Sequence, residues 1–228
     1  MSNPKQLTFP WNKENKSSFD SFYTTKLNKQ LLFLLKNEAL KDDLLIYGAK
    51  DSGKTYLLQA LCNQFNNQGK SSFFLPVRQA IELSVDILDS LENIELVCID
   101  GIESLVGNKA WEIGLFNLIN RSFNSNNRLI FTSAKNIDGM NFELKDLDSR
   151  LRKIQSHELH SLADDDILYA LKHIANLRCI ELGSKEAQYL LTYADRNISD
   201  LVKILESLDQ LSMEMKRKIT IPLIKEVI

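Results

Sequence analysis

Short apolar runs and stretches with helical periodicity alternate along most of this chain. Runs of four to eight apolar residues predict buried strands, and apolar residues spaced three or four apart predict helices. The predicted strands cover residues 44–47, 71–75, 96–100, 128–133 and 154–159. The predicted helices lie at about 26–39, from 55 onward, and at 76–91, 109–123 and 144–151. Beyond these, only helices are predicted, at about 164–178, 184–193, 199–213 and 221–227.

This order of elements predicts an α/β fold with a doubly wound parallel sheet, followed by a small α-helical lid domain. We place the α/β domain at residues 19–160 and the lid at 161–228. Residues 1–18 are polar, contain Pro4 and Pro10 and show no periodicity. They predict an extended or disordered tail.

The composition narrows the class of protein. The formal net charge is −2 with a pI near 6.0, so no global field draws the chain onto nucleic acid or an anionic membrane. The N-terminus has no apolar signal region and no apolar run reaches the roughly 18 residues of a membrane span. The odd number of separated cysteines, Cys62, Cys98 and Cys179, predicts free buried thiols. A cytoplasmic protein is expected.

The segment from Gly48 to Thr55 fills every fixed position of the pattern GxxxxGK[ST], between a predicted strand and a predicted helix. Two glycines leave the backbone open, so that successive N–H groups and the positive end of the helix can point at phosphate oxygens. Lys54 would reach the β- and γ-phosphates. The predicted nucleotide-binding residues are Gly48, Ala49, Lys50, Asp51, Ser52, Gly53, Lys54, Thr55 and Tyr56.

A second part of the same site is predicted at Asp100, which ends the apolar run 96–99. At the carboxyl end of its strand Asp100 would face Thr55, and the two residues would hold the shell of a Mg²⁺ ion. Many ATPases of this layout place a glutamate directly after this aspartate, whereas Gly101 follows here and Glu103 comes two residues later. With that base missing, fast hydrolysis by this chain alone is not expected.

The tail carries two apolar anchors in a polar context. Pro10 favours an extended conformation at Phe9, so Leu7 and Phe9 would project on one side, beside the amide of Gln6. This pattern suits a peptide that docks on a partner. The alternative, in which the aromatic residues fold back on the chain's own domain, stays open at this point.

With these motifs in this order, the chain resembles the AAA+ family and, within it, the bacterial initiator DnaA and its short regulatory homologues. The resemblance covers nearly the whole chain. The segments that carry it, besides the glycine loop, are Gln6–Pro10, Phe19–Phe22, Leu96–Glu103, Trp111–Glu112, Asp146–Leu151, Leu208–Leu211 and Thr220–Glu226.

The resemblance implies ADP or ATP with Mg²⁺ as cofactors, and DnaA and the DNA polymerase sliding clamp (its beta subunit) as partners. It implies that Gln6, Leu7, Phe9 and Pro10 bind the clamp, with Phe9 where related peptides usually have leucine. It also implies that Arg150 acts in trans as an arginine finger in the hydrolysis of DnaA-bound ATP. Ser199 stands where DnaA relatives carry a lid arginine that senses the γ-phosphate.

Two function classes follow from these features. One is a regulator that inactivates DnaA; the other is a self-sufficient AAA+ ATPase such as a helicase loader. The missing glutamate after Asp100 and the tail motif favour the regulator. Since the chain stops before any helix-turn-helix domain, no sequence-specific DNA binding is expected. The oligomeric state stays open, and a homo-oligomer is possible.

Overall fold

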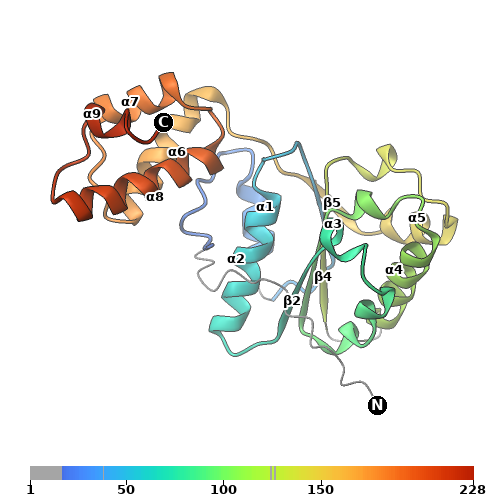
Figure 1. Cartoon of the computed structure of the whole chain (residues 1–228). Helices are drawn as coiled ribbons and strands as arrows, with labels where there is room; N and C mark the ends of the chain where they lie inside the picture. The colour runs from blue at the N-terminus through green and yellow to red at the C-terminus, as the bar shows by residue number, and fades with distance from the viewer. Residues whose placement is uncertain (1–16, 38, 124, 126) are drawn as a thin grey trace, which may run out of the picture.

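In this computed structural model, which describes residues 17–37, 39–123, 125 and 127–228, an α/β domain precedes a helical domain (Figure 1). The sheet has five parallel strands in the order β2-β3-β4-β1-β5. The strands are β1 (Leu44–Tyr47), β2 (Ser72–Pro76), β3 (Leu96–Asp100), β4 (Arg128–Ser133) and β5 (Gln155–Glu158). The predicted fold class is therefore confirmed, because the apolar runs form a parallel sheet that only helical crossovers can connect.

The strands send alternate side chains into two separate cores. Leu45 faces the core formed with α3 (Val77–Ala80), α4 (Lys109–Ser122) and α5 (Lys145–Leu151). Leu44 faces the core formed with α1 (Lys29–Lys36) and α2 (Lys54–Asn67). Figure 1 shows α1 and α2 on one side of the sheet and α4 and α5 on the other. Because side chains alternate along a strand, the central strands β1, β3 and β4 are buried on both faces, whereas the edge strand β5 is largely exposed.

The carboxyl ends of the strands meet at one edge. Tyr47 of β1 is in register with Ser133 of β4, and Ile99 of β3 with Phe131 of β4. The chain leaves β1 at Gly48, whose N–H donates to the carbonyl of Ser133 at 3.2 Å. The loops after β1 and β3 therefore begin at the same edge, on either side of the end of β4, as expected for the ligand-binding edge of such a sheet.

The helical domain has a core of its own. Its helices are α6 (Asp164–Leu177), α7 (Ser184–Tyr193), α8 (Ile198–Met215) and α9 (Ile221–Ile224). Asn28, just before α1, ties it to the sheet: its amide donates to the carbonyl of His160 at 2.8 Å and accepts from the N–H of His160 at 3.0 Å. No helix in the described part of the chain is long and apolar enough to cross a membrane.

The helix predicted from Pro76 to Leu91 is wrong. Helix α3 ends at Ala80 and is followed by two 3-10 turns, η1 (Val85–Leu88) and η2 (Leu91–Asn93). Ser84 is extended and its hydroxyl accepts the N–H of Asp86, which stops helix propagation and starts a new turn. The apolar residues still reach the core, but in two short pieces.

The prediction of three buried thiols is also wrong at one position. Cys62 and Cys98 are buried, while Cys179 is exposed. Cys179 has a φ of +58° in the turn after α6, and the next residue, Ile180, is the one that enters the lid core. An apolar neighbourhood in the sequence does not decide which residue of a tight turn points inward.

Candidate functional site

At two positions of the loop between β1 and α2, the surrounding atoms leave no room for a side chain, so glycine is required. A Cβ at position 48 would lie 2.4 Å from the carbonyl oxygen of Leu159. Position 53 has a φ of +98°, and a Cβ there would lie 2.8 Å from the ring of Phe22. Any side chain at either position would force the surrounding backbone or ring to move. The loop can close tightly at the start of α2 only with glycine at both ends.

Lys54 lies at the centre of this loop. Its ammonium donates to the carbonyls of Gly48 and Ala49, both at 2.7 Å, and to the hydroxyl of Ser52 at 3.4 Å. Burial lowers the pKa of Lys54, and the charges of Glu103, Asp100 and Asp51 partly offset this. A phosphate bound here would replace the carbonyls as the acceptor of the Lys54 N–H groups.

The structure brings Thr55 and Asp100 together across the edge of the sheet. The hydroxyl of Thr55 donates to Asp100 Oδ2 at 2.8 Å. The other oxygen, Asp100 Oδ1, accepts from the hydroxyl of Thr132, which itself accepts the N–H of Gly101 at 2.9 Å. A hydroxyl and a carboxylate are the hard oxygen donors that Mg²⁺ prefers, so Thr55 and Asp100 fit that ion. Thr132 orients Asp100, a role for which the sequence held no signal.

Tyr56 of α2 contacts the segment that precedes α1. Its hydroxyl donates to the carbonyl of Ser18 and accepts the N–H of Ser18, each at 3.2 Å. The rings of Tyr56 and Phe22 have centroids 6.1 Å apart. Of the remaining predicted loop residues, Ser52 is buried, Lys50 and Asp51 are exposed, and Asp51 has a φ of +62°.

The lid contributes a basic residue that the sequence reading missed. Lys203 lies one helical turn after Ser199 on α8 and donates to Asp200 at 2.7 Å. That bond, with the charges of Asp200 and Asp51, raises the pKa of Lys203. The charge of Asp51, a residue of the phosphate loop, is the smallest of the influences that raise this pKa. Arg196, in contrast, pairs with Asp164 within the lid at 3.0 Å.

Arg150 lies on α5, across the sheet from α2. It is half-buried, and its side chain has no ion pair or hydrogen bond with the described residues. Arg152 takes the local carboxylates instead: it donates to Asp148 at 2.8 Å and pairs with Asp138. The guanidinium of Arg150 is thus left for another group.

The start of α5 is held by a carboxylate inside the protein. Glu112 of α4 is fully buried. Its Oε2 accepts the N–H of Leu144, the residue before α5, at 2.7 Å, and its Oε1 accepts the N–H of Gly107 at 3.0 Å. Both oxygens are satisfied by backbone donors, so Glu112 joins α4, α5 and the loop between β3 and α4 in one contact.

The predicted clamp-binding residues, Gln6, Leu7, Phe9 and Pro10, lie outside the described residues. Ser17, the first residue that the structure describes, contacts α2. Asn63 of that helix donates to the carbonyl of Ser17 at 2.9 Å, and Gln59 accepts from the hydroxyl of Ser17 at 3.4 Å.

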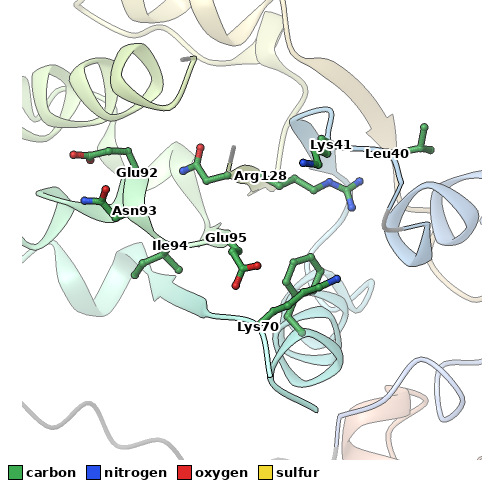
Figure 2. A pocket seen from close by; sticks show the side chains of 10 residues that line it. Leu40, Lys41, Lys70, Glu92, Asn93, Ile94, Glu95 and Arg128 are labelled. Atoms are coloured by element: carbon green, nitrogen blue, oxygen red, sulfur yellow. The ribbon is translucent and has the colours of Figure 1, made fainter. Parts of the chain in front are cut away.

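A cavity of about 290 Å³ lies at the opposite edge of the sheet (Figure 2). Figure 2 shows Arg128 reaching across it, and Glu92 and Glu95 on its walls. These charges already have partners: Arg128 donates to three backbone carbonyls, Glu92 pairs with Arg121, and Glu95 accepts from Ser71. The cavity does not present free groups for a ligand.

Comparison with known families matches the chain in two parts. The model of the bacterial DnaA ATPase domain matches residues 14–160, and the model of the Hda lid domain matches residues 164–228. An uncharacterized protein of Haemophilus influenzae is 33% identical over 227 residues, which cover 98% of each chain.

Solved structures share the fold. Domain III of the Thermotoga maritima replication initiation protein DnaA aligns with a TM-score of 0.73 and 19% identity, over 93% of this chain and 97% of that one. AMPPCP-bound DnaA from Aquifex aeolicus aligns with a TM-score of 0.70 and 19% identity, over 85% of this chain and 65% of that one. The Thermotoga maritima RuvB branch migration motor aligns with a TM-score of 0.67 and 18% identity, over 93% and 71%.

Proposed function

Because this chain belongs to the Hda-like branch of the DnaA-related AAA+ proteins, we propose that it regulates the initiation of chromosome replication. In this proposal it binds ADP or ATP with Mg²⁺, docks on the DNA polymerase sliding clamp and promotes hydrolysis of DnaA-bound ATP. The observation that carries the proposal is Arg150, a guanidinium without a partner in the described chain on a helix that is fixed at both ends.

The nucleotide would bind at the loop between β1 and α2. Lys54 would contact the phosphates, and the exposed N–H groups at the start of α2 would supply further donors. When bound, Mg²⁺ would be held by Thr55 and Asp100 and would neutralise part of the phosphate charge. Tyr56 and Phe22 form an aromatic wall beside the loop.

Selectivity for the γ-phosphate would be small. Arg196 is engaged by Asp164, and Lys203 is bonded to Asp200, so neither lid cation is free to bind a third phosphate without giving up a partner. ADP would therefore bind at least as well as ATP.

Arg150 would act on the nucleotide of a neighbouring DnaA molecule. Negative charge builds on the γ-phosphoryl oxygens in the transition state, and an arginine supplied in trans accelerates hydrolysis by roughly 10³–10⁵ in well-studied NTPases. A guanidinium suits this role because it stays charged and binds two oxygens at once. The contacts of Glu112 and Arg152 would hold α5 while the tip of Arg150 reaches out.

The tail would tether the protein to the clamp. A short peptide that orders on binding gives a weak contact, but tethering raises the local concentration near DnaA. Alanine at Gln6, Leu7 and Phe9 together should leave folding and nucleotide binding intact and remove clamp binding in a pull-down. Unchanged clamp binding would favour the alternative in which the tail folds back on its own domain.

The decisive experiment measures hydrolysis of DnaA-bound ATP with this protein, the clamp and DNA, each omitted in turn. We expect full stimulation only with all components present. The rival function, a self-sufficient ATPase such as a helicase loader, predicts rapid multiple turnover without DnaA, and that result would replace our proposal.

A further inference from the structure

The chain turns sharply after Asp100 and brings Glu103 back toward the phosphate site. Gly101 has a φ of +83°, which an L-residue rarely adopts, and the 3-10 turn η3 (Ile102–Leu105) follows at once. A Cβ placed at position 101 would lie 3.9 Å from each carboxylate oxygen of Glu103. The carboxylate of Glu103 therefore lies beside the direction in which a side chain at position 101 would project.

One oxygen of this carboxylate has no partner. Glu103 Oε2 is buried and makes no hydrogen bond among the described residues. The other oxygen, Oε1, lies 3.9 Å from a guanidinium nitrogen of Arg78, a long contact to a largely exposed side chain. Buried acceptors without a donor are rare in folded proteins, so its presence calls for an explanation in function.

The charge of Glu103 also acts on the lysine of the phosphate loop. Among the charges that raise the pKa of Lys54 against its burial, that of Glu103 is the largest, ahead of Asp100 and Asp51. Glu103 is thus the carboxylate that acts most strongly on the group that would meet the β- and γ-phosphates.

We propose that Glu103 is the water-positioning carboxylate of this chain's own nucleotide site, presented by a turn rather than by the residue after Asp100. This inference rests on the nucleotide site of the proposed function. A water held by Glu103 Oε2 would attack the γ-phosphorus, the bond from that phosphorus to the β–γ bridging oxygen would break, and ADP would leave. The proton of the water would pass to Glu103 and then to phosphate, so that ATP and water give ADP and inorganic phosphate.

A glutamate at position 101, directly after Asp100, and the glutamate at position 103 require different backbone geometries. A glutamate at position 101 would extend directly from the strand end, but the φ of +83° disfavours any side chain there. The same backbone angle starts the turn that carries Glu103 back. Gly101 therefore removes the usual base and provides the route by which another carboxylate replaces it.

The test compares Glu103→Gln with the wild type and with Glu82→Gln, a matched change at an exposed carboxylate in the turn after α3. The Kd of ATP, the Kd of ADP and the single-turnover rate of ATP hydrolysis without DnaA are measured. General-base groups contribute about 10²–10⁴-fold, so the rate should fall at least about 100-fold in Glu103→Gln. Nucleotide affinity should be equal or higher, because a negative charge near the phosphates is removed.

Hydrolysis and nucleotide affinity should both stay unchanged in Glu82→Gln. If Glu103→Gln fails to fold, Glu103→Asp retracts the carboxylate by one methylene and should also slow hydrolysis. An unchanged hydrolysis rate with intact nucleotide binding overturns the inference alone. Absence of nucleotide binding by the wild type overturns the proposed function instead.

Discussion

The phosphate loop and α5 both carry groups for phosphate chemistry, but they hold them in opposite ways. Around the loop, each central side chain is tied to its own chain: Lys54 to two carbonyls, and Thr55 and Thr132 to Asp100. On α5 the helix is tied, through Glu112 and Arg152, while Arg150 has no partner among the described residues.

This difference indicates where each group would act. A side chain that acts within its own site is pre-organised by contacts in the same chain. One that acts on a neighbouring molecule needs a backbone that is held in place and a terminal group without a partner in its own chain. The contrast also explains why Arg152, with its two carboxylates, is a poor candidate for the finger although it is only two residues away.

The largest effect is expected at Arg150. Arg150→Ala should fold, bind nucleotide and bind the clamp, yet lose roughly 10³-fold or more of the stimulated hydrolysis by DnaA. The measurement is the rate of phosphate release from DnaA-bound ATP.

Two controls sharpen this prediction. Lys153→Ala removes an exposed positive charge from the turn after the same helix and should act normally. Arg152→Ala should also act nearly normally, since its exposed ion pairs contribute only about 0–1 kcal/mol each to stability. Equal loss of stimulation in the Arg150 and Arg152 variants would refute the distinction between free and tied arginines.

The second effect concerns Lys54, whose ammonium makes three hydrogen bonds within the phosphate loop. Lys54→Ala should weaken ADP and ATP binding alike, by about 10- to 150-fold, because a charged hydrogen-bond donor contributes about 1.5–3 kcal/mol. Titration with both nucleotides measures this. Wild-type protein should show no large preference for ATP, and a strong preference would contradict the view that the lid cations are engaged elsewhere.

A smaller effect is expected at Glu112, which joins the loop before α4 to the start of α5. In Glu112→Gln one backbone N–H, of Gly107 or of Leu144, would face an amide NH₂ group and lose its acceptor, at a cost of about 1–3 kcal/mol in unfolding free energy. Stimulation of DnaA should fall about tenfold while nucleotide affinity is unchanged. Glu143→Gln, at an exposed neighbour, is the matched control. A parallel loss of nucleotide affinity would show that Glu112 supports the whole domain and not α5.

The smallest effect is expected at His157 on β5, the strand that follows α5 and pairs with β1. Burial lowers the pKa of His157, so below pH 6.5 the unfolded chain binds a proton that the folded chain does not. Stability should therefore fall as the pH drops below about 6.5, and His157→Gln should reduce that slope. Urea unfolding at pH 7.5 and pH 5.5 measures it. An unchanged slope in the variant would assign the acid sensitivity to other groups.

Much of the fold could be predicted from the pattern of residues because the central strands β1, β3 and β4 are buried on both faces. Such strands read as unbroken apolar runs, and β3 and β4 begin and end at the predicted residues. The helix predicted over 76–91 failed because a serine turn, invisible to hydrophobic spacing, interrupts it.

The residues of the functional site could be predicted from the sequence only where they belong to a known motif. Lys54, Thr55 and Asp100 stand in known patterns, but the placement of Glu103 depends on one backbone angle at Gly101, and that of Lys203 on how the lid packs. Glu112 joins segments more than thirty residues apart, from Gly107 to Leu144. Contacts of that kind follow from the folded backbone and leave no local signal.

The two hydrogen bonds between Asn28 and the backbone of His160 fix the point where the chain leaves the sheet for the lid. The amide holds both backbone groups of His160, so the segment after β5 can neither slide nor twist against the base of α1 without breaking two part-buried hydrogen bonds. A second contact joins the lid to the segment before α1: His173 Nε2 on α6 lies 2.9 Å from the carbonyl oxygen of Asp20. The start of the lid is therefore held to the α/β domain at two points, residues 160 and 173.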